Sequence, residues 1–420
     1  MASHYQILII GGGTAGIMTA AQLKRKNKAL DIGLIEPSET HYYQPAWTLV
    51  GAGAYDYKKT AQPMAKLIPK GVSWIKDYAT AFNPSEHKVK TRSSGDITYD
   101  YLVVAPGLVM APELIEGLPE ALDKGVVCSN YTNPEHTWKL LRAFKGGNAI
   151  FTQPTTPIKC GGAPQKIAYM AADYFRKNGL TEKTNVVFAT PGSVIFGVKP
   201  IRETLMKVIG RYGIHFKPYY APFKIDADKK IVYFKHTAPQ ENKCVVNEDN
   251  HLGEVATGNE IIELPFDFLH LAPPQTAPKF IRESSLVNAA GWLDVDHHSL
   301  QHNNYHNIFG LGDVAGLPTA KTGAAVRKQV PVVVDNILTL INYDKIGNKS
   351  YNGYSSCPLV TGYGKMTLAE FDYDSNFTPD PKLKRMLVFN SDKEHWRLWM
   401  FKKVMLPYLY WNKMMKGKNV

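Results

Sequence analysis

The sequence is poor in cysteine and has no long apolar run. Only four of its 420 residues are cysteines, and no two of them form a C-x-x-C pair. A secreted disulfide framework and a zinc site are therefore excluded, and we expect no metal. No stretch of about 18 uninterrupted apolar residues occurs, which excludes an ordinary membrane-spanning helix. The residues before the first strand form neither a basic nor an apolar leader, so we expect no signal or transit peptide.

Acidic residues are outnumbered by basic ones. The chain has 37 acidic and 49 basic side chains, for a net charge of +12. Such a balance favours anionic partners. No compact basic cluster is interleaved with aromatic residues as in a nucleic-acid module, so we expect no nucleic-acid partner. The length is sufficient for two or three domains.

A glycine-rich turn follows the first apolar run, residues 6–10. Its G-x-G-x-x-G spacing falls on Gly11, Gly13 and Gly16. This spacing lets a pyrophosphate approach bare backbone at the start of a helix, which we place at residues 14–26, with Thr14 and Ala15 at its positive end. A second apolar run ends at Glu36, where a carboxylate accepts a hydrogen bond from ribose. The pattern predicts an adenine dinucleotide site, the alternative being a glycine turn that binds nothing.

A later strand indicates which dinucleotide binds. Residues 307–311 form an apolar run that ends in Gly312 and Asp313, and a helix is expected from about Ala320 to Ile341. An acid at this place can bind a ribityl hydroxyl, while the helix start points at the pyrimidine edge of a flavin. Because NAD has no ribityl chain, we predict FAD.

A second nucleotide fold is expected near residues 148–152, with its helix at 164–177. The turn between them, residues 153–163, has prolines where a phosphate turn requires glycines. The turn after the next strand, near Thr190, also lacks the glycine spacing. We therefore expect that the electron donor is not a pyridine nucleotide.

Two of the cysteines have suggestive surroundings. Cys160 lies just before the helix at 164–177 with Lys159 alongside, which should favour its thiolate. Cys357 lies in a turn that enters a strand, 197 residues later. Spacing alone favours two inert thiols over a redox pair. Cys128 and Cys244 have no such context.

The C-terminal stretch is aromatic and basic. Residues 395–416 alternate large apolar side chains with cations at helical intervals, and we expect Pro407 to break the helix into two. Six cations between Arg397 and Lys418 suit anionic lipid headgroups, with the rings buried among lipids. The alternative is a helix packed on the protein's own core or on a partner subunit.

Several segments together resemble the sulfide:quinone oxidoreductases, nearest to the branch with the mitochondrial enzymes. They are residues 11–16, 36–38, 41–45, 47–53, 159–160, 163–166, 291–292, 312–313, 317–322 and 354–363. The contexts of the two cysteines are the most specific of these, because general flavin enzymes lack them.

The resemblance implies a peripheral membrane flavoprotein. Cys160 and Cys357 would be joined at rest by a disulfide or trisulfide. Hydrogen sulfide, as hydrosulfide, would open this bridge and leave a persulfide on Cys357, while two electrons pass through FAD to ubiquinone or menaquinone. A small sulfur acceptor such as glutathione, sulfite, cyanide or coenzyme A would take the persulfide sulfur. The implied quinone residues are Tyr363 and Phe371, and Cys128 would have no catalytic part.

The predicted fold class is α/β, with two Rossmann-like dinucleotide-binding domains and a C-terminal amphipathic helical region for membrane association. The FAD domain comprises 1–115 and 265–345, the second domain without an intact NAD turn is 116–264, and the redox cysteine, quinone pocket and membrane helices lie in 346–420. The predicted cofactor-binding residues are Gly11, Gly13, Thr14, Ala15, Gly16, Glu36, Gln44, Gly312, Asp313 and Lys321.

The sequence leaves two locations and several rival functions to compare. We expect the cytoplasmic face of a bacterial membrane, with the mitochondrial inner membrane as the alternative, and we leave a homo-oligomer open. The nearest rival is a type II NADH:quinone oxidoreductase, which needs an intact second glycine turn and no cysteine pair. Further rivals are a flavin-binding interaction protein without turnover and a soluble sulfide dehydrogenase that reduces a cytochrome.

Overall fold

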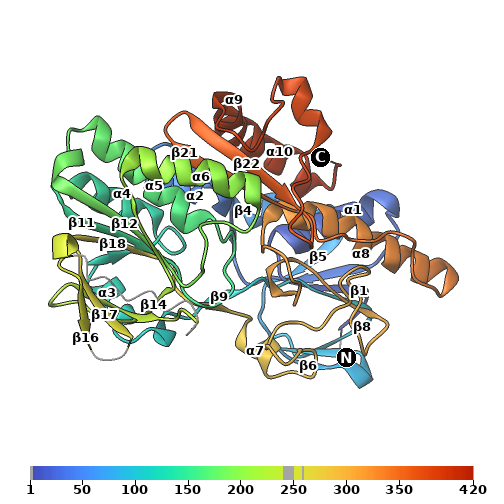
Figure 1. Ribbon diagram of the computed structural model, residues 1–420. Helices are drawn as coiled ribbons and strands as arrows, with labels where there is room; N and C mark the ends of the chain where they lie inside the picture. Colours follow the sequence, from blue (N-terminus) through green and yellow to red (C-terminus); the bar gives the residue numbers. More distant parts are fainter. Residues whose placement is uncertain (1–2, 240–249, 258–259, 420) are drawn as a thin grey trace.

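Two sheets built mainly from parallel strands form the body of the protein (Figure 1). This computed structural model describes residues 3–239, 250–257 and 260–419, so Cys244 lies outside the described residues. These two mainly parallel sheets confirm the predicted α/β class with two nucleotide-binding folds.

The first sheet carries the dinucleotide turn. Its strand order is β5-β2-β1-β8-β7-β6, and β20 also pairs with β8. The bounds are β1 Ser3–Ile10, β2 Ile32–Ile35, β5 Val72–Ile75, β6 Ala79–Asn83, β7 Lys88–Thr91, β8 Asp96–Val104 and β20 Ile308–Gly310. The second half of β1 is apolar and buried on both faces, as in the centre of a parallel sheet. Helices α1 (Thr14–Lys26) and α8 (Gly323–Tyr343) contact each other over one face.

The predicted helices of this domain are present with small shifts at their ends. Helix α1 has the predicted bounds. Helix α8 begins at Gly323 rather than near Ala320, because the Thr322 hydroxyl caps it by accepting a hydrogen bond from the Ala325 N–H at 3.1 Å.

The second sheet has the order β10-β18-β11-β12-β13. Its bounds are β10 Val127–Cys128, β11 Gly147–Thr152, β12 Thr184–Thr190, β13 His215–Pro218 and β18 Phe268–Leu271. On one side lie α4 (Pro134–Ala143), α5 (Ala163–Lys177) and α6 (Lys199–Tyr212). A smaller antiparallel sheet packs on the other side, with β14 Tyr220–Asp226, β15 Ile231–His236, β16 Val255–Thr257 and β17 Ile261–Pro265.

One predicted domain boundary is wrong. We expected the first domain to resume at residue 265, but β18 pairs in parallel with β10 and β11 of the second sheet. The return to the first domain comes later, through β19 (Gln275–Thr276), which pairs with β9 (Val109–Met110) of the outgoing connection. The two crossings between the domains therefore run side by side.

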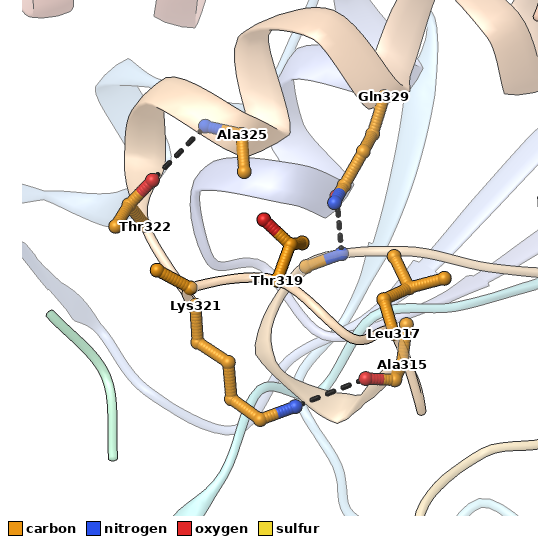
Figure 2. A pocket seen from close by; sticks show the side chains of 9 residues that line it. Ala315, Leu317, Thr319, Lys321, Thr322, Ala325 and Gln329 are labelled. Atoms are coloured by element: carbon orange, nitrogen blue, oxygen red, sulfur yellow. Dashed lines mark hydrogen bonds between the residues drawn. The ribbon is translucent and has the colours of Figure 1, made fainter. Parts of the chain in front are cut away.

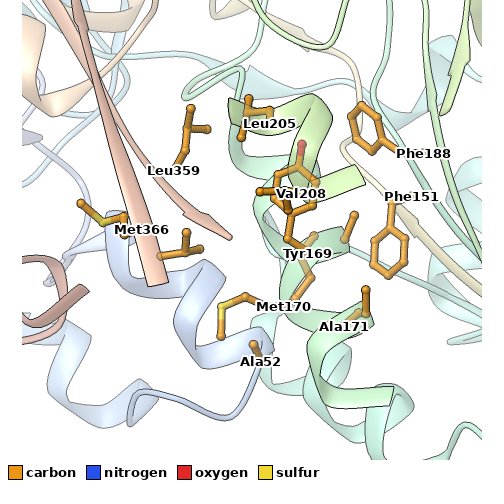
Figure 3. Close-up of a cluster of buried hydrophobic side chains, with 14 of the residues drawn as sticks. Ala52, Phe151, Tyr169, Met170, Ala171, Phe188, Leu205, Val208, Leu359 and Met366 are labelled. Atoms are coloured by element: carbon orange, nitrogen blue, oxygen red, sulfur yellow. The ribbon is translucent and has the colours of Figure 1, made fainter. Parts of the chain in front are cut away.

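The C-terminal region packs across both domains. The hairpin of β21 (Ser355–Gly362) and β22 (Lys365–Phe371) lies against α5 and joins the core cluster shown in Figure 3. Then α9 (Trp396–Met400), a π-helical turn (Phe401–Met405) and α10 (Leu406–Asn412) follow one another without a gap. The chain stays helical through Pro407, so the expected break is wrong; the helix is instead distorted into the π-helical turn that lies just before this proline.

Two helical glycines should respond oppositely to alanine. A Cβ at Gly16 in α1 would lie 1.9 Å from the Gly11 carbonyl oxygen, whereas a Cβ at Gly210 in α6 meets nothing within 4 Å. Gly16→Ala should lower the free energy of unfolding by about 1–3 kcal/mol through overpacking. Gly210→Ala should raise it by up to about 1 kcal/mol through helix propensity. Urea unfolding followed by circular dichroism tests both, and a shift of the same sign in the two variants would contradict this account.

Candidate active site

Two thiols far apart in the sequence meet between the second domain and the C-terminal hairpin. The sulfurs of Cys160 and Cys357 lie 4.0 Å apart. Glycine at 162 permits this approach, because a Cβ there would come within 2.6 Å of the Leu359 side chain on β21. Spacing alone favoured inert thiols, whereas the fold pairs them.

The backbone at Cys160 is constrained. Its φ angle is +52°, in the left-handed region that non-glycine residues rarely adopt. The Cys160 N–H donates to the Lys321 carbonyl at 2.8 Å, and its carbonyl accepts from the Ala163 N–H at 2.7 Å and the Tyr131 hydroxyl at 3.2 Å. Such a conformation costs about 1–3 kcal/mol and persists where the surroundings hold it, as at active sites.

A buried lysine sets the protonation of the thiols. Lys166, in the first turn of α5 and only 2% exposed, places its Nζ 2.8 Å from the Cys160 sulfur. A hydrogen bond from the Cys357 thiol and then the Lys166 charge hold the pKa of Cys160 well below its usual value. The hydrogen bond to Cys160 and burial raise the pKa of Cys357. Burial disfavours the Lys166 charge, but the two adjacent thiols outweigh it and raise its pKa. Cys160 is therefore the thiolate and Cys357 the thiol.

The cation expected beside Cys160 was the wrong one. Lys159 instead donates from its Nζ to the Gln44 side-chain oxygen, and its pKa is lowered by burial, against the charge of Asp313. Sequence reasoning missed Lys166, although this cation directly precedes the apolar run 167–172 of the same helix, a signal of a buried charge.

A second buried lysine comes from the C-terminal helix. Lys402, in the π-helical turn, is 4% exposed and donates to the Pro45 carbonyl at 3.2 Å. Burial and then the positive charge of Lys166 lower its pKa to about 7, although the thiols oppose this shift. We expected all six cations of this stretch to face lipid, and for Lys402 that expectation is wrong.

The dinucleotide turn fits the pyrophosphate of FAD. A Cβ at Gly13 would meet nothing within 4 Å, so there is room for a ligand beside the start of α1 and Thr14. Glu36 accepts from the Gly12 N–H at 2.6 Å and from the Ser38 N–H at 2.7 Å. This carboxylate therefore sits at the turn, where its further predicted role is to bind ribose. The same turn and helix start include the predicted residues Gly11, Ala15 and Gly16.

A small cavity lies at the start of α8, where the flavin end of the cofactor is expected (Figure 2). The Gly312 N–H donates to the Gln329 side-chain oxygen at 2.9 Å, and Lys321 Nζ donates to the Ala315 carbonyl at 2.9 Å. The Lys321 ammonium lies 3.9 Å from the Trp292 ring centroid. Burial lowers the pKa of Lys321 to about 8, against the opposing charge of Asp313. Burial raises the pKa of Asp313, although Lys159 and Lys321 oppose the shift.

The two predicted quinone residues do not meet. Tyr363 lies in the turn of the hairpin, where its hydroxyl donates to the Ala52 carbonyl. Phe371 ends β22 and packs on Phe196, with ring centroids 6.1 Å apart. A strand of this length spans roughly 20 Å, so one quinone ring cannot touch both.

Cys128 is separate from the pair. Its sulfur is buried and lies 3.5 Å from the Leu269 carbonyl oxygen, and burial raises its pKa to about 12. A thiol with this pKa is a poor nucleophile at neutral pH.

Two nucleotide folds, an FAD-type turn and a dithiol define a flavin-dependent disulfide oxidoreductase. The model of the pyridine nucleotide-disulphide oxidoreductase family matches residues 5–331. The chain is 40% identical to the mitochondrial sulfide:quinone oxidoreductase of Mus musculus, over 99% of this chain and 87% of that protein. It is 41% identical to the mitochondrial enzyme of Dictyostelium discoideum, over 98% and 86%. The crystal structure of the sulfide:quinone oxidoreductase from Aquifex aeolicus shares the fold, with a TM-score of 0.77 at 22% identity over 99% and 92% of the two chains. The chain therefore belongs to the sulfide:quinone oxidoreductases within that family.

Removing the Lys166 charge should raise the pKa of Cys160. In the reduced protein we expect a thiolate at neutral pH, seen as ultraviolet thiolate absorbance that disappears only well below pH 7. Lys166→Met should shift this titration upward by at least about one unit, toward an ordinary thiol value. Lys177→Met, on the exposed part of the same helix, is the matched control and should leave the titration in place. Equal titrations in Lys166→Met and the unaltered protein would contradict the assigned role.

Proposed function

We propose that this protein oxidises hydrogen sulfide at Cys160 and Cys357 and passes two electrons through FAD to a membrane quinone. The observation that carries the proposal is the 4.0 Å approach of the two sulfurs in a chain of this family. The Cys160 backbone bonds to Lys321 at the start of α8, so the dithiol lies next to the flavin end of the cofactor site. Bound FAD supplies the two-electron acceptor.

The separation of the sulfurs is compatible with a bridge. One S–S bond is about 2.05 Å long, so a disulfide needs the sulfurs to approach by roughly 2 Å. Two such bonds meet at a bent central sulfur, so the outer sulfurs of a trisulfide lie roughly 3.3 Å apart, which is nearer to the observed distance than a disulfide. Both bridges fit with small movements of the Cys160 loop, and the trisulfide needs the smaller one.

The unequal pKa values indicate which sulfur leaves. Hydrosulfide attacks the Sγ atom of Cys357, the bond from this sulfur toward Cys160 breaks, and its electron pair stays on the Cys160 side, as a thiolate from a disulfide or as a persulfide anion from a trisulfide. Lys166 stabilises that negative charge, which makes it the better leaving group. The proton of hydrosulfide stays on the new persulfide at Cys357. A small acceptor such as glutathione, sulfite, cyanide or coenzyme A then takes this sulfur.

The second domain supports sulfide rather than NADH as the donor. The turn between β11 and α5 contains Pro154, Pro157 and Cys160, and its only two glycines, Gly161 and Gly162, do not form the G-x-G-x-x-G spacing of NADH-binding folds. Type II NADH:quinone oxidoreduction therefore remains the weaker function.

The C-terminal helix presents an apolar surface suited to a membrane. Its exposed side chains are Trp396, Met400, Val404, Met405 and Tyr408. Among the described residues, no helix has both the length and the apolar character needed to cross a bilayer. We therefore propose peripheral binding through this surface, which brings quinone within reach. The membrane is either the cytoplasmic face of a bacterial membrane or, as the names of the relatives favour, a mitochondrial one.

Anaerobic addition of sulfide should bleach the flavin band, whereas NADH should not. Cys160→Ser or Cys357→Ser should slow sulfide-driven bleaching by at least about a hundredfold while FAD stays bound. Cys128→Ser, at the buried cysteine outside the pair, is the control and should bleach normally. Bleaching by NADH but not by sulfide would refute the proposed function.

Charge placed on the apolar surface should weaken membrane binding. Val404→Asp should reduce cosedimentation with anionic phospholipid vesicles by at least about tenfold, because a carboxylate would enter the interface. Val255→Asp is the matched control, since Val255 is similarly exposed but lies on the small sheet far from α9 in Figure 1. If both variants sediment like the unaltered protein, another surface binds the membrane.

A further inference from the structure

The end of the chain is bonded to both sides of the dinucleotide turn. Tyr410 of α10 is 4% exposed, and its hydroxyl lies 2.7 Å from the Thr14 hydroxyl and 2.6 Å from His41 Nε2. His41 Nδ1 lies 3.1 Å from the Gly12 carbonyl oxygen. One tyrosine thus connects to Thr14 directly and to Gly12 through a histidine.

The direction of every bond in this chain can be deduced. A carbonyl oxygen only accepts, so His41 Nδ1 must carry the proton and donate to Gly12. Burial lowers the pKa of His41 to about 4, which keeps the ring neutral and leaves Nε2 as an acceptor. Tyr410 must therefore donate to His41, and its oxygen accepts from the Thr14 hydroxyl. The hydroxyl of Tyr410 thus serves two partners at once, the buried His41 and the partly buried Thr14.

The rest of the tail lies along α1. Met414 and Met415 are buried in the same core cluster as Ile17 and Met18 of that helix. A Cβ at Gly417 would lie 2.6 Å from the backbone of Ala21, so the tail approaches α1 closely. In Figure 1 the C-terminus accordingly lies near α1.

We propose that Tyr410 is a positioning residue for FAD, and that α10 with the tail holds the phosphate-binding turn in its binding-competent shape. Gly12 and Thr14 flank Gly13, where the open space for the pyrophosphate lies. Without the Tyr410 hydroxyl, the His41 nitrogen and the Thr14 hydroxyl lose their buried partner, and the turn loses its link to the core. This inference rests on the use of FAD in the proposed function, but its test needs no turnover.

Tyr410→Phe isolates the hydroxyl. The phenyl ring keeps the contacts with Tyr43 and Trp411, at centroid distances of 4.6 and 4.9 Å. We expect FAD release from the diluted holoprotein, followed by flavin fluorescence, to be about tenfold faster than in the unaltered protein. Tyr408→Phe on the exposed side of the same helix is the matched control and should release FAD at the normal rate. Unchanged release from Tyr410→Phe, or equally fast release from Tyr408→Phe, would overturn the proposal.

A second measurement needs no substitution. Because coupling is reciprocal, removing FAD should increase amide hydrogen exchange in residues 406–417 more than in β14 of the distant small sheet. A rise in 406–417 no larger than in β14 would also overturn the proposal. Sulfide-driven bleaching of the holoprotein is a separate assay, so failure of the tail's role can be told apart from failure of the sulfide function.

Discussion

The contact between the Lys166 ammonium and the Cys160 sulfur is the interaction on which the active site depends. A lone thiolate or a lone ammonium group in this buried position would lose several kcal/mol of hydration. The attraction between the two charges offsets this loss of hydration, and the Cys357 thiol adds a hydrogen bond to the same sulfur. Because Lys166 donates its hydrogen bond to Cys160 rather than to Cys357, the two ends of the proposed bridge are chemically unequal before any substrate arrives. The proposed order of bond breaking in sulfide oxidation follows from that inequality.

The second nucleotide fold has the parallel sheet and covering helices of a dinucleotide-binding domain, but the turn after its strand β11 carries a cysteine. The loop after β11 no longer offers glycine backbone to a phosphate, and it instead carries Cys160 to the Lys321 carbonyl before α8. The hairpin of β21 and β22 then brings Cys357 over the start of α5, where Gly162 leaves room for it. A place that serves cofactor docking in pyridine nucleotide-binding relatives of this fold thus holds a dithiol.

Sequence patterns predicted those elements whose conformation is determined by residues close together in the chain. The dinucleotide turn and α1 follow from residues within one strand–turn–helix unit, and the predicted bounds of α1 are confirmed. Strand β18 was assigned to the wrong sheet because a four-residue buried strand carries no information about which neighbours it pairs with. The meeting of Cys160 and Cys357 is a tertiary contact, and residue spacing alone argued against it; only the family resemblance indicated the pair. Lys402 lies one helical turn after the buried Leu398, so its helix position, rather than its charge, decides that it points inward.

The link between Tyr410 and His41 joins residues 369 positions apart. During translation, the ribosome releases the glycine turn long before the tyrosine that braces it. A chain still under synthesis therefore has the groove for the dinucleotide but lacks its last support. If Tyr410 positions FAD as proposed, flavin capture becomes a late step of biogenesis, because the final segment must first leave the ribosome and pack on α1.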